Sequence, residues 1–109
     1  MVSVIAEKNR KNEYVRFTCS GHAGYDEYGR DIVCAALSML VINTVNAIDA
    51  LTDCKLTVTT DETDGEMEVI FPDAASEDAG LLIDAMLLGI RGVIEEYGSA
   101  YATLTMKEV

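Results

Sequence analysis

Eleven residues separate His22, the only histidine of the chain, from Cys34, one of its three cysteines. An imidazole in contact with a thiol can take its proton, hold the resulting ion pair and later protonate a leaving amine. Closing a loop of this length adds little entropic cost, so folding can bring the two side chains together. The pair therefore indicates a cysteine nucleophile with a histidine general base.

The apolar run around Cys34 predicts a helix from Asp31, a favourable N-cap, to about residue 51. Cys34 would then lie in the first helical turn, near unpaired N–H groups and the positive end of the helix dipole. Such a place favours a thiolate and can stabilise an oxyanion. The charge of Asp31 works partly against this effect. Ser38 follows one turn later on the same face, where it contacts either a bound peptide or its own backbone.

The segment between the two candidate residues has the composition of a mobile cover. Gly24 and Gly29 give it conformational freedom, and Tyr25 and Tyr28 can cover apolar groups of a substrate. The predicted mobile loop comprises Ala23, Gly24, Tyr25, Tyr28 and Gly29. Gly21, which precedes the histidine, is predicted to support the site together with Asp31 and Ser38.

Structural interpretations of the same residues remain open. A cysteine near the start of a buried helix is often a small packed side chain, and a histidine after a strand often lies at the surface. The spacing of Cys19 and His22 also fits a zinc site completed by Cys34 and Cys54. Against zinc, the alternation of residues 14–20 turns Cys19 inward, and no CxxC pair is present. We therefore predict no metal site.

The remaining elements follow from periodicity and from turn and cap residues. Two hairpins are predicted, the first from strands at residues 2–7 and 14–20, the second from strands at 55–60 and 66–71 with Gly65 in its turn. A second helix is capped by Ser76 and ends near Tyr97 at Gly98, and a last strand covers residues 100–108. The helix after Asp31 carries few charges and is expected to be buried on most sides. Gly89 and Gly92 weaken the second helix but allow a close neighbour.

This ββαββαβ order predicts an α+β fold, a two-layer sandwich of a mainly antiparallel sheet with two long helices. The length of 109 residues fits one domain, residues 1–109. A net charge of −11 argues against direct binding of nucleic acid and favours a basic partner. We expect a cytoplasmic protein, because the N-terminal charge order is the reverse of a secretory signal. We expect no membrane span, because the uncharged run at 32–48 is shorter than the ~20 residues needed.

The stretch GHAGYDEYGRDIVCAALS, residues 21–38, resembles the signature of the ribosomal-processing cysteine proteases, the Prp family. The resemblance rests on a Gly-His-Ala followed by an Asp-Ile-Val-Cys-Ala-Ala, and it extends to the size and element order of nearly the whole chain. It implies that Cys34 is the nucleophile and His22 the base, acting through a thioester acyl-enzyme without metal or cofactor. Asp31 and Ser38 are weaker assignments, to support of the dyad and to the substrate cleft.

The resemblance also implies a substrate and an assembly. The family removes the basic N-terminal extension of large-subunit ribosomal protein twenty-seven, cutting after paired aromatic residues, and its members are homodimers with a loop that moves when substrate binds. Two alternatives stay open: an acidic dimeric module that binds a basic ribosomal segment without cutting it, and a thiol redox sensor. In the sensor, Cys34 would be oxidised and Cys19 or Cys54 would resolve it.

Overall fold

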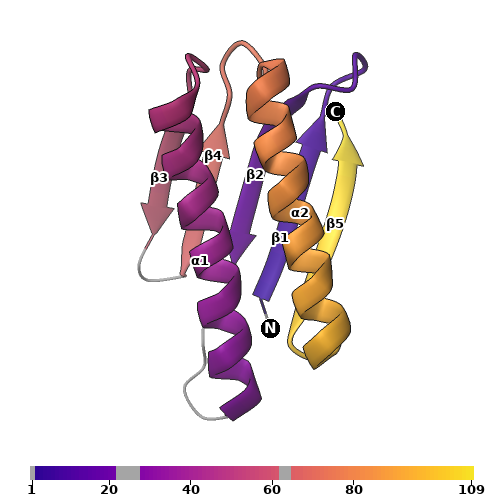
Figure 1. Cartoon of the computed structure of the whole chain (residues 1–109). Helices are drawn as coiled ribbons and strands as arrows, with labels where there is room; N and C mark the ends of the chain where they lie inside the picture. Colours follow the sequence, from indigo (N-terminus) through magenta and orange to yellow (C-terminus); the bar gives the residue numbers. More distant parts are fainter. Residues whose placement is uncertain (1, 22–27, 62–64) are drawn as a thin grey trace.

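The computed structural model describes residues 2–21, 28–61 and 65–109, and of residues 28–31 only the backbone. The described elements are β1 (Val2–Lys8), β2 (Tyr14–Ser20), α1 (Tyr28–Leu51), β3 (Thr57–Asp61), β4 (Glu66–Ile70), α2 (Glu77–Tyr97) and β5 (Ala102–Glu108). Their order confirms the predicted α+β fold. Figure 1 shows both helices on one face of a single sheet, which gives two layers.

The sheet has the strand order β3-β4-β2-β1-β5. Each of the pairs β3–β4, β4–β2 and β2–β1 is antiparallel, and β5 joins the sheet by a parallel ladder with β1. The first and last strands of the chain are therefore neighbours, and β3 and β5 form the two edges. The prediction of a mainly antiparallel sheet is confirmed, and the strand order is new information.

The core lies between the sheet and the helices, because each element turns its apolar residues to that side. Along β1 and β2 the fully buried residues Val4, Ala6 and Phe17 face the helices. Each helix contributes a stripe at three- and four-residue spacing, as expected for one buried face. The stripes are Val33, Leu37, Val41 and Ile48 in α1, and Ala79, Ile83, Leu87 and Ile90 in α2.

Burial of α1 on most sides is a wrong prediction. The helix exposes Met39 and Ile42 along its length and Leu51 at its end, with Met39 67% exposed. A single stripe is enough to cover the sheet, so the scarcity of charge on this helix leaves an apolar outer surface. Residues Ile32–Leu51 are long and apolar enough to cross a membrane by length and composition, and 28% of that window is buried in the protein. The core stripe shows that this helix already packs on the sheet.

Local signals define α2 as predicted. The Ser76 side chain accepts a hydrogen bond from the Ala79 N–H at 3.4 Å, which satisfies one of the free donors of the first turn. At the other end Gly98, with φ 95°, donates its N–H to the Ile94 carbonyl at 2.7 Å. Both caps are confirmed.

The helices approach each other at one of the two glycines in α2. A Cβ built on Gly89 would lie 3.1 Å from a methyl carbon of Leu40 in α1, whereas a Cβ on Gly92 would meet nothing within 4 Å. The predicted role in close approach therefore holds for Gly89 and is wrong for Gly92. The backbone at Gly92 is open to solvent, so no neighbour requires a glycine there.

Tyr14 faces the core, contrary to the simple alternation of residues 14–20, which places it with Arg16 on the outer face. The register between β1 and β2 shifts after Glu7, so that Lys8 pairs with Tyr14. One extra residue in β2 reverses the side-chain direction beyond it. Tyr14 is 5% exposed, and its hydroxyl donates a hydrogen bond to Asp84 of α2.

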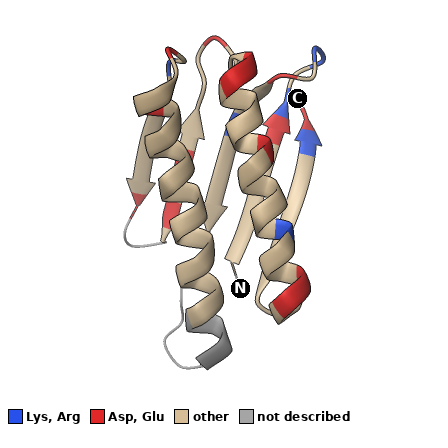
Figure 2. Cartoon of the chain, viewed as in Figure 1, with Lys and Arg blue, Asp and Glu red and all other residues tan. Residues whose placement is uncertain are grey.

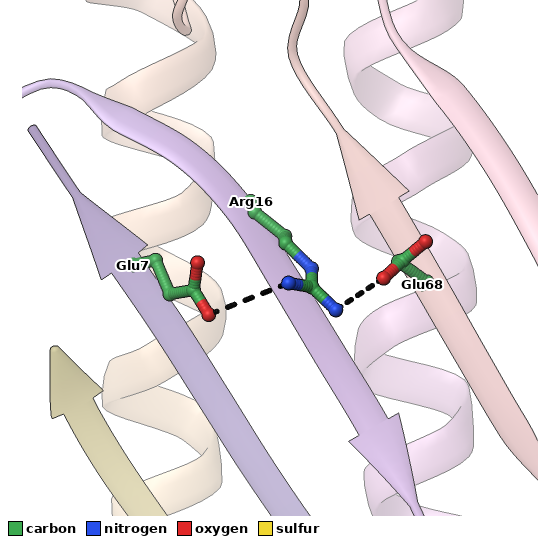
Figure 3. Close-up of polar contacts among 3 residues, drawn as sticks. All are labelled: Glu7, Arg16 and Glu68. Atoms are coloured by element: carbon green, nitrogen blue, oxygen red, sulfur yellow. Dashed lines mark ion pairs between the residues drawn. The ribbon is translucent and has the colours of Figure 1, made fainter. Parts of the chain in front are cut away.

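The outer face of the sheet is polar and carries an ion-pair network. Figure 3 shows Arg16 of β2 between Glu7 of β1 and Glu68 of β4. The contact to Glu7 is 3.7 Å, and Glu68 is the closer partner. Cross-strand pairs of opposite charge stabilise a sheet modestly. The candidate site lies on the opposite face of the sheet, which the helices cover.

Candidate active site

A cavity of about 240 Å³ lies between the N-terminal half of α1 and the ends of β1, β2, β3 and β4. It brings together Gly21, Cys34 and Ser38, three of the residues predicted from the sequence to belong to the site. Its other lining residues are Val2, Cys19, Val41, Ile42, Thr60, Asp61, Gly65, Glu66 and Met67. We refer to this space as the Cys34 cavity.

Cys34 is not in the first turn of its helix, as the sequence suggested. Helix α1 begins at Tyr28, three residues before the predicted N-cap Asp31, which makes Cys34 the seventh helical residue. An acidic residue is favourable both as an N-cap and inside the first turn, so Asp31 alone does not show where the helix begins. The unpaired N–H groups belong to the first four residues, and Cys34 lies beyond them. The helix end therefore does not by itself activate this thiol.

Two residues of the predicted mobile loop are helical. Tyr28 and Gly29 belong to the first turn of α1, which begins before Asp31, so their assignment to a loop is wrong. His22, Ala23, Gly24 and Tyr25 lie outside the described residues, and so does the side chain of Asp31. The pairing of His22 with Cys34 stays a prediction.

Gly21 connects the cavity to this segment. It follows β2 with φ 87°, a conformation that favours glycine, and it lines the Cys34 cavity. Its next residue in the sequence is His22. The last described residue before the segment therefore lies at the same cavity as the candidate nucleophile.

Cys19 is a second thiol at this cavity, and its position was predicted correctly as inward-facing. Burial, followed by the negative charge of Cys34, raises the pKa of Cys19 to about 11. A group with this pKa is a neutral thiol near pH 7. Cys19 is therefore protonated in the reduced protein, and Cys34 is the candidate for the proteolytic reaction.

No local sequence pattern marks the wall opposite α1. Thr60 and Asp61 end β3, while Glu66 and Met67 begin β4, and the pairing of the two strands sets Asp61 opposite Glu66. These residues lie about thirty positions beyond Cys34 in the chain, so only the tertiary fold brings them to it. Met67, which pairs with Cys19, gives this wall an apolar side chain, whereas Asp61 and Glu66 share the outer face of the sheet with Glu68.

A larger, open hollow of about 1080 Å³ lies at the opposite end of the sheet, beside Lys8, Tyr14 and the N-terminal turns of α2. It contains none of the predicted site residues. Among the described residues, no group of three or more His, Cys, Asp or Glu side chains could hold a metal ion. The zinc alternative needed Cys54, which lies beyond the far end of α1 from Cys34.

The position of a thiol in the wall of a cavity agrees with the comparisons to known proteins. The family model described as cysteine protease Prp matches residues 1–102. The chain belongs to the cysteine protease Prp family. A ribosomal processing cysteine protease Prp of Staphylococcus aureus is 32% identical over 97 residues, which is 89% of this chain and 92% of that protein. The Prp protein of Bacillus subtilis is 27% identical over 101 residues, covering 89% of this chain and 90% of its own.

Solved structures give the same result. The Staphylococcus aureus Prp in complex with a substrate peptide superposes with a TM-score of 0.89 at 30% identity, covering 98% of this chain and 100% of its own. The same protease with a covalently linked product peptide has a TM-score of 0.86 at 31% identity, with the same coverage. This chain is therefore a cysteine protease of the ribosomal processing Prp family, which confirms the resemblance seen in the signature.

Proposed function

We propose that this protein is a cytoplasmic endopeptidase that removes the basic N-terminal extension of large-subunit ribosomal protein twenty-seven, cutting after paired aromatic residues. In this proposal Cys34 is the nucleophile and His22 the general base. The observation that carries it is the position of Cys34 in the wall of a cavity shared with Gly21, the residue bonded to His22. The Prp protease of Staphylococcus aureus, 31% identical, has been seen with a covalently linked product peptide, which supports a covalent mechanism.

The wall of the Cys34 cavity supports an apolar side chain at the cleavage point. Val2, Ile42 and Met67 line it from β1, α1 and β4. An aromatic ring buried against such a wall gains hydrophobic free energy in proportion to the area removed from water. Ser38, one helical turn from Cys34 and in the same cavity, is then a substrate contact.

The acidity of the chain supports a basic substrate. The chain has a net charge of −11, with 19 Asp and Glu against 8 Lys and Arg. This negative field attracts a basic extension and accelerates the encounter with it.

The proposed reaction has two stages. In the first, His22 takes the Cys34 proton, and the thiolate attacks the carbonyl carbon of the scissile bond. The C–N bond then breaks, His22 returns the proton to the departing amine, and a thioester joins the new carboxyl end to Cys34. In the second stage water, deprotonated by His22, attacks the thioester, and the product carboxylate and the free thiol are released.

The remaining assignments complete the proposal. Ala23, Gly24 and Tyr25 belong to a loop that covers the bound peptide, and Asp31 supports the charged form of the dyad. The protein acts as a homodimer and binds neither nucleic acid nor membrane.

Figure 2 supports the homodimer, because the described part of α1 is almost free of charged residues while acids are spread over the rest of the molecule. Met39 of α1 and Leu88 of α2 are exposed. The residues that follow them in the sequence, Leu40 and Gly89, are in contact where the two helices pack. Two negatively charged copies meet with least repulsion on such a surface.

The test is cleavage of the precursor of the ribosomal protein, followed by mass spectrometry of both products. The parent protein is expected to cut once, after the aromatic pair, and Cys34→Ala and Cys34→Ser are expected to give no product. His22→Ala is expected to lower the rate by a factor on the order of 100 or more, as general bases typically contribute. Cys54→Ser is the matched control, because Cys54 lies away from the cavity, and it should cut at the parental rate. Cleavage by Cys34→Ala at the parental rate would refute the proposal.

A further inference from the structure

Two of the three cysteines of the chain line the same cavity from opposite layers of the fold. Cys34 reaches it from α1, and Cys19 reaches it from the helix-covered face of β2. The direction of Cys19 follows from the register, since its neighbours are Val4, a fully buried core residue, and Met67, which lines the cavity too. Directly opposite residues of adjacent strands share a face, so the Cys19 thiol points toward α1.

The electrostatics agree with this proximity. Negative charge on Cys34 disfavours ionisation of Cys19, and together with burial this raises the Cys19 pKa. Such an influence agrees with the position of both thiols at one cavity. Both thiols are half-buried and reduced in this structure.

The third cysteine does not share this arrangement. Cys54 follows Leu51, the last residue of α1, whereas Cys34 lies in the second turn from the other end. Leu51 lies seventeen positions beyond Cys34 along the helix, which corresponds to about 25 Å at the usual rise per residue. Cys54 is therefore out of reach of Cys34 and provides an internal control for any effect that depends on proximity.

We propose that Cys19 is a resolving thiol that captures oxidised Cys34 as a reversible disulfide and so protects the protease from permanent oxidation. That the bridge stops proteolysis rests on the proposed role of Cys34 as nucleophile. The bridge itself depends only on the two thiols at the Cys34 cavity.

The oxidant in this scheme is hydrogen peroxide. The Cys34 thiolate attacks one peroxide oxygen, a sulfur–oxygen bond forms, the oxygen–oxygen bond breaks, and hydroxide leaves, which gives a sulfenic acid. The Cys19 sulfur then attacks the Cys34 sulfur, the sulfur–oxygen bond breaks, and the departing hydroxide takes the Cys19 proton to become water. Sulfur is oxidised and peroxide reduced, and a dithiol reductant reverses the result. Without a resolving thiol, further peroxide carries the sulfenic acid to sulfinic acid, which dithiols do not reduce.

The experiment treats the parent, Cys19→Ser and Cys54→Ser proteins with hydrogen peroxide, then divides each sample for peptide mapping and for dithiothreitol recovery. We expect a Cys19–Cys34 linked peptide in the parent and in Cys54→Ser, and recovery of most of the initial cleavage activity. In Cys19→Ser we expect sulfinic Cys34 and little recovery, each protein being compared with its own untreated sample. Cys19→Ala replaces Cys19→Ser if the serine variant does not fold.

Two outcomes would overturn the proposal: a parent map without the Cys19–Cys34 peptide, or a Cys19→Ser protein that recovers as fully as the parent. The mapping needs no substrate, so it also separates this proposal from the proposed function. If the linked peptide forms while cleavage continues, the bridge stands and Cys34 is not the nucleophile. If Cys34→Ala is inactive and no linked peptide forms, the proposed function stands and the resolving thiol does not.

Discussion

Tyr14 illustrates how a single side chain ties the sheet to a helix. Its ring is buried at the edge of the core, with the Lys8 ammonium 4.5 Å from the ring centroid and the hydroxyl bonded to Asp84 of α2. Burial, followed by the hydrogen bond to Asp84, raises the pKa of Tyr14 well above its ordinary value of 10.0. The neutral phenol is therefore part of the folded structure, while the unfolded chain ionises normally.

Replacing Tyr14 with phenylalanine tests this contact. Tyr14→Phe removes the donor to a carboxylate, and we expect the free energy of unfolding near pH 7 to fall by about 1–3 kcal/mol. In the parent, the raised pKa gives stability that is complete below pH 10 and is lost as the pH rises from there toward the folded pKa. Tyr14→Phe should lack that alkaline loss. Urea unfolding from pH 7 to 11 measures both effects, and Tyr97→Phe, at an exposed site, is the control.

The Tyr97→Phe control separates the effect of losing the Tyr14–Asp84 bond from the general effect of removing a hydroxyl. If Tyr14→Phe and Tyr97→Phe have equal unfolding free energies and equal pH profiles, the Tyr14–Asp84 bond contributes nothing to stability.

At the scale of elements, α1 and α2 pack closely at one point. Gly89 faces Leu40 so closely that a methyl group must displace the leucine, while Gly92 faces open space. Both glycines lower the intrinsic helix stability by about the same amount relative to alanine, about 1 kcal/mol. The effect of a substitution at the two glycines should therefore differ only through the packing of α1 on α2.

A pair of alanine substitutions isolates this difference. We expect Gly92→Ala to raise the free energy of unfolding by about 1 kcal/mol, because only helix propensity changes. Gly89→Ala should gain clearly less, because the new methyl would lie 3.1 Å from Leu40 and force its side chain to move. Urea unfolding of both variants gives the comparison. Equal gains at the two positions would mean that the helices do not constrain each other there.

The same elements show what the sequence can predict. Both ends of α2 were predictable because the caps Ser76 and Gly98 act locally. The start of α1 was missed, since Asp31 suits two positions equally well, and the direction of Tyr14 was missed because a bulge has no sequence signal here. In the site, the Gly21–Cys34–Ser38 group came from one continuous motif, whereas Met67 and its neighbours enter only through strand order, which no local pattern encodes.

At the scale of the whole molecule, the acidic charge and the apolar outer surface of α1 belong together. A net charge of −11 opposes self-association everywhere except where charge is absent. Met39 is 67% exposed and Leu88 is 70% exposed, on adjacent helices. Apolar side chains exposed on two neighbouring helices make this surface the candidate for contact between two copies.

Charge placed on this surface should prevent dimer formation. We expect the parent to sediment as a dimer and Met39→Glu and Leu88→Glu as monomers, because each would bury a carboxylate in an apolar contact between acidic partners. Analytical ultracentrifugation measures the mass, and circular dichroism checks that each variant is folded. Val109→Glu, exposed at the other end of the chain, should remain dimeric. If Met39→Glu and Leu88→Glu also sediment as dimers, the interface lies elsewhere.

The parallel ladder between β1 and β5 makes the candidate active site depend on a strand that is remote from it in the sequence. Val2 pairs with Ala102 and also lines the Cys34 cavity, so one wall of that cavity rests on β5. When β5 is detached, β1 has an open side whose unpaired N–H and C=O groups can pair with other polypeptides. The organised cavity therefore forms only after two segments from opposite ends of the described fold have joined.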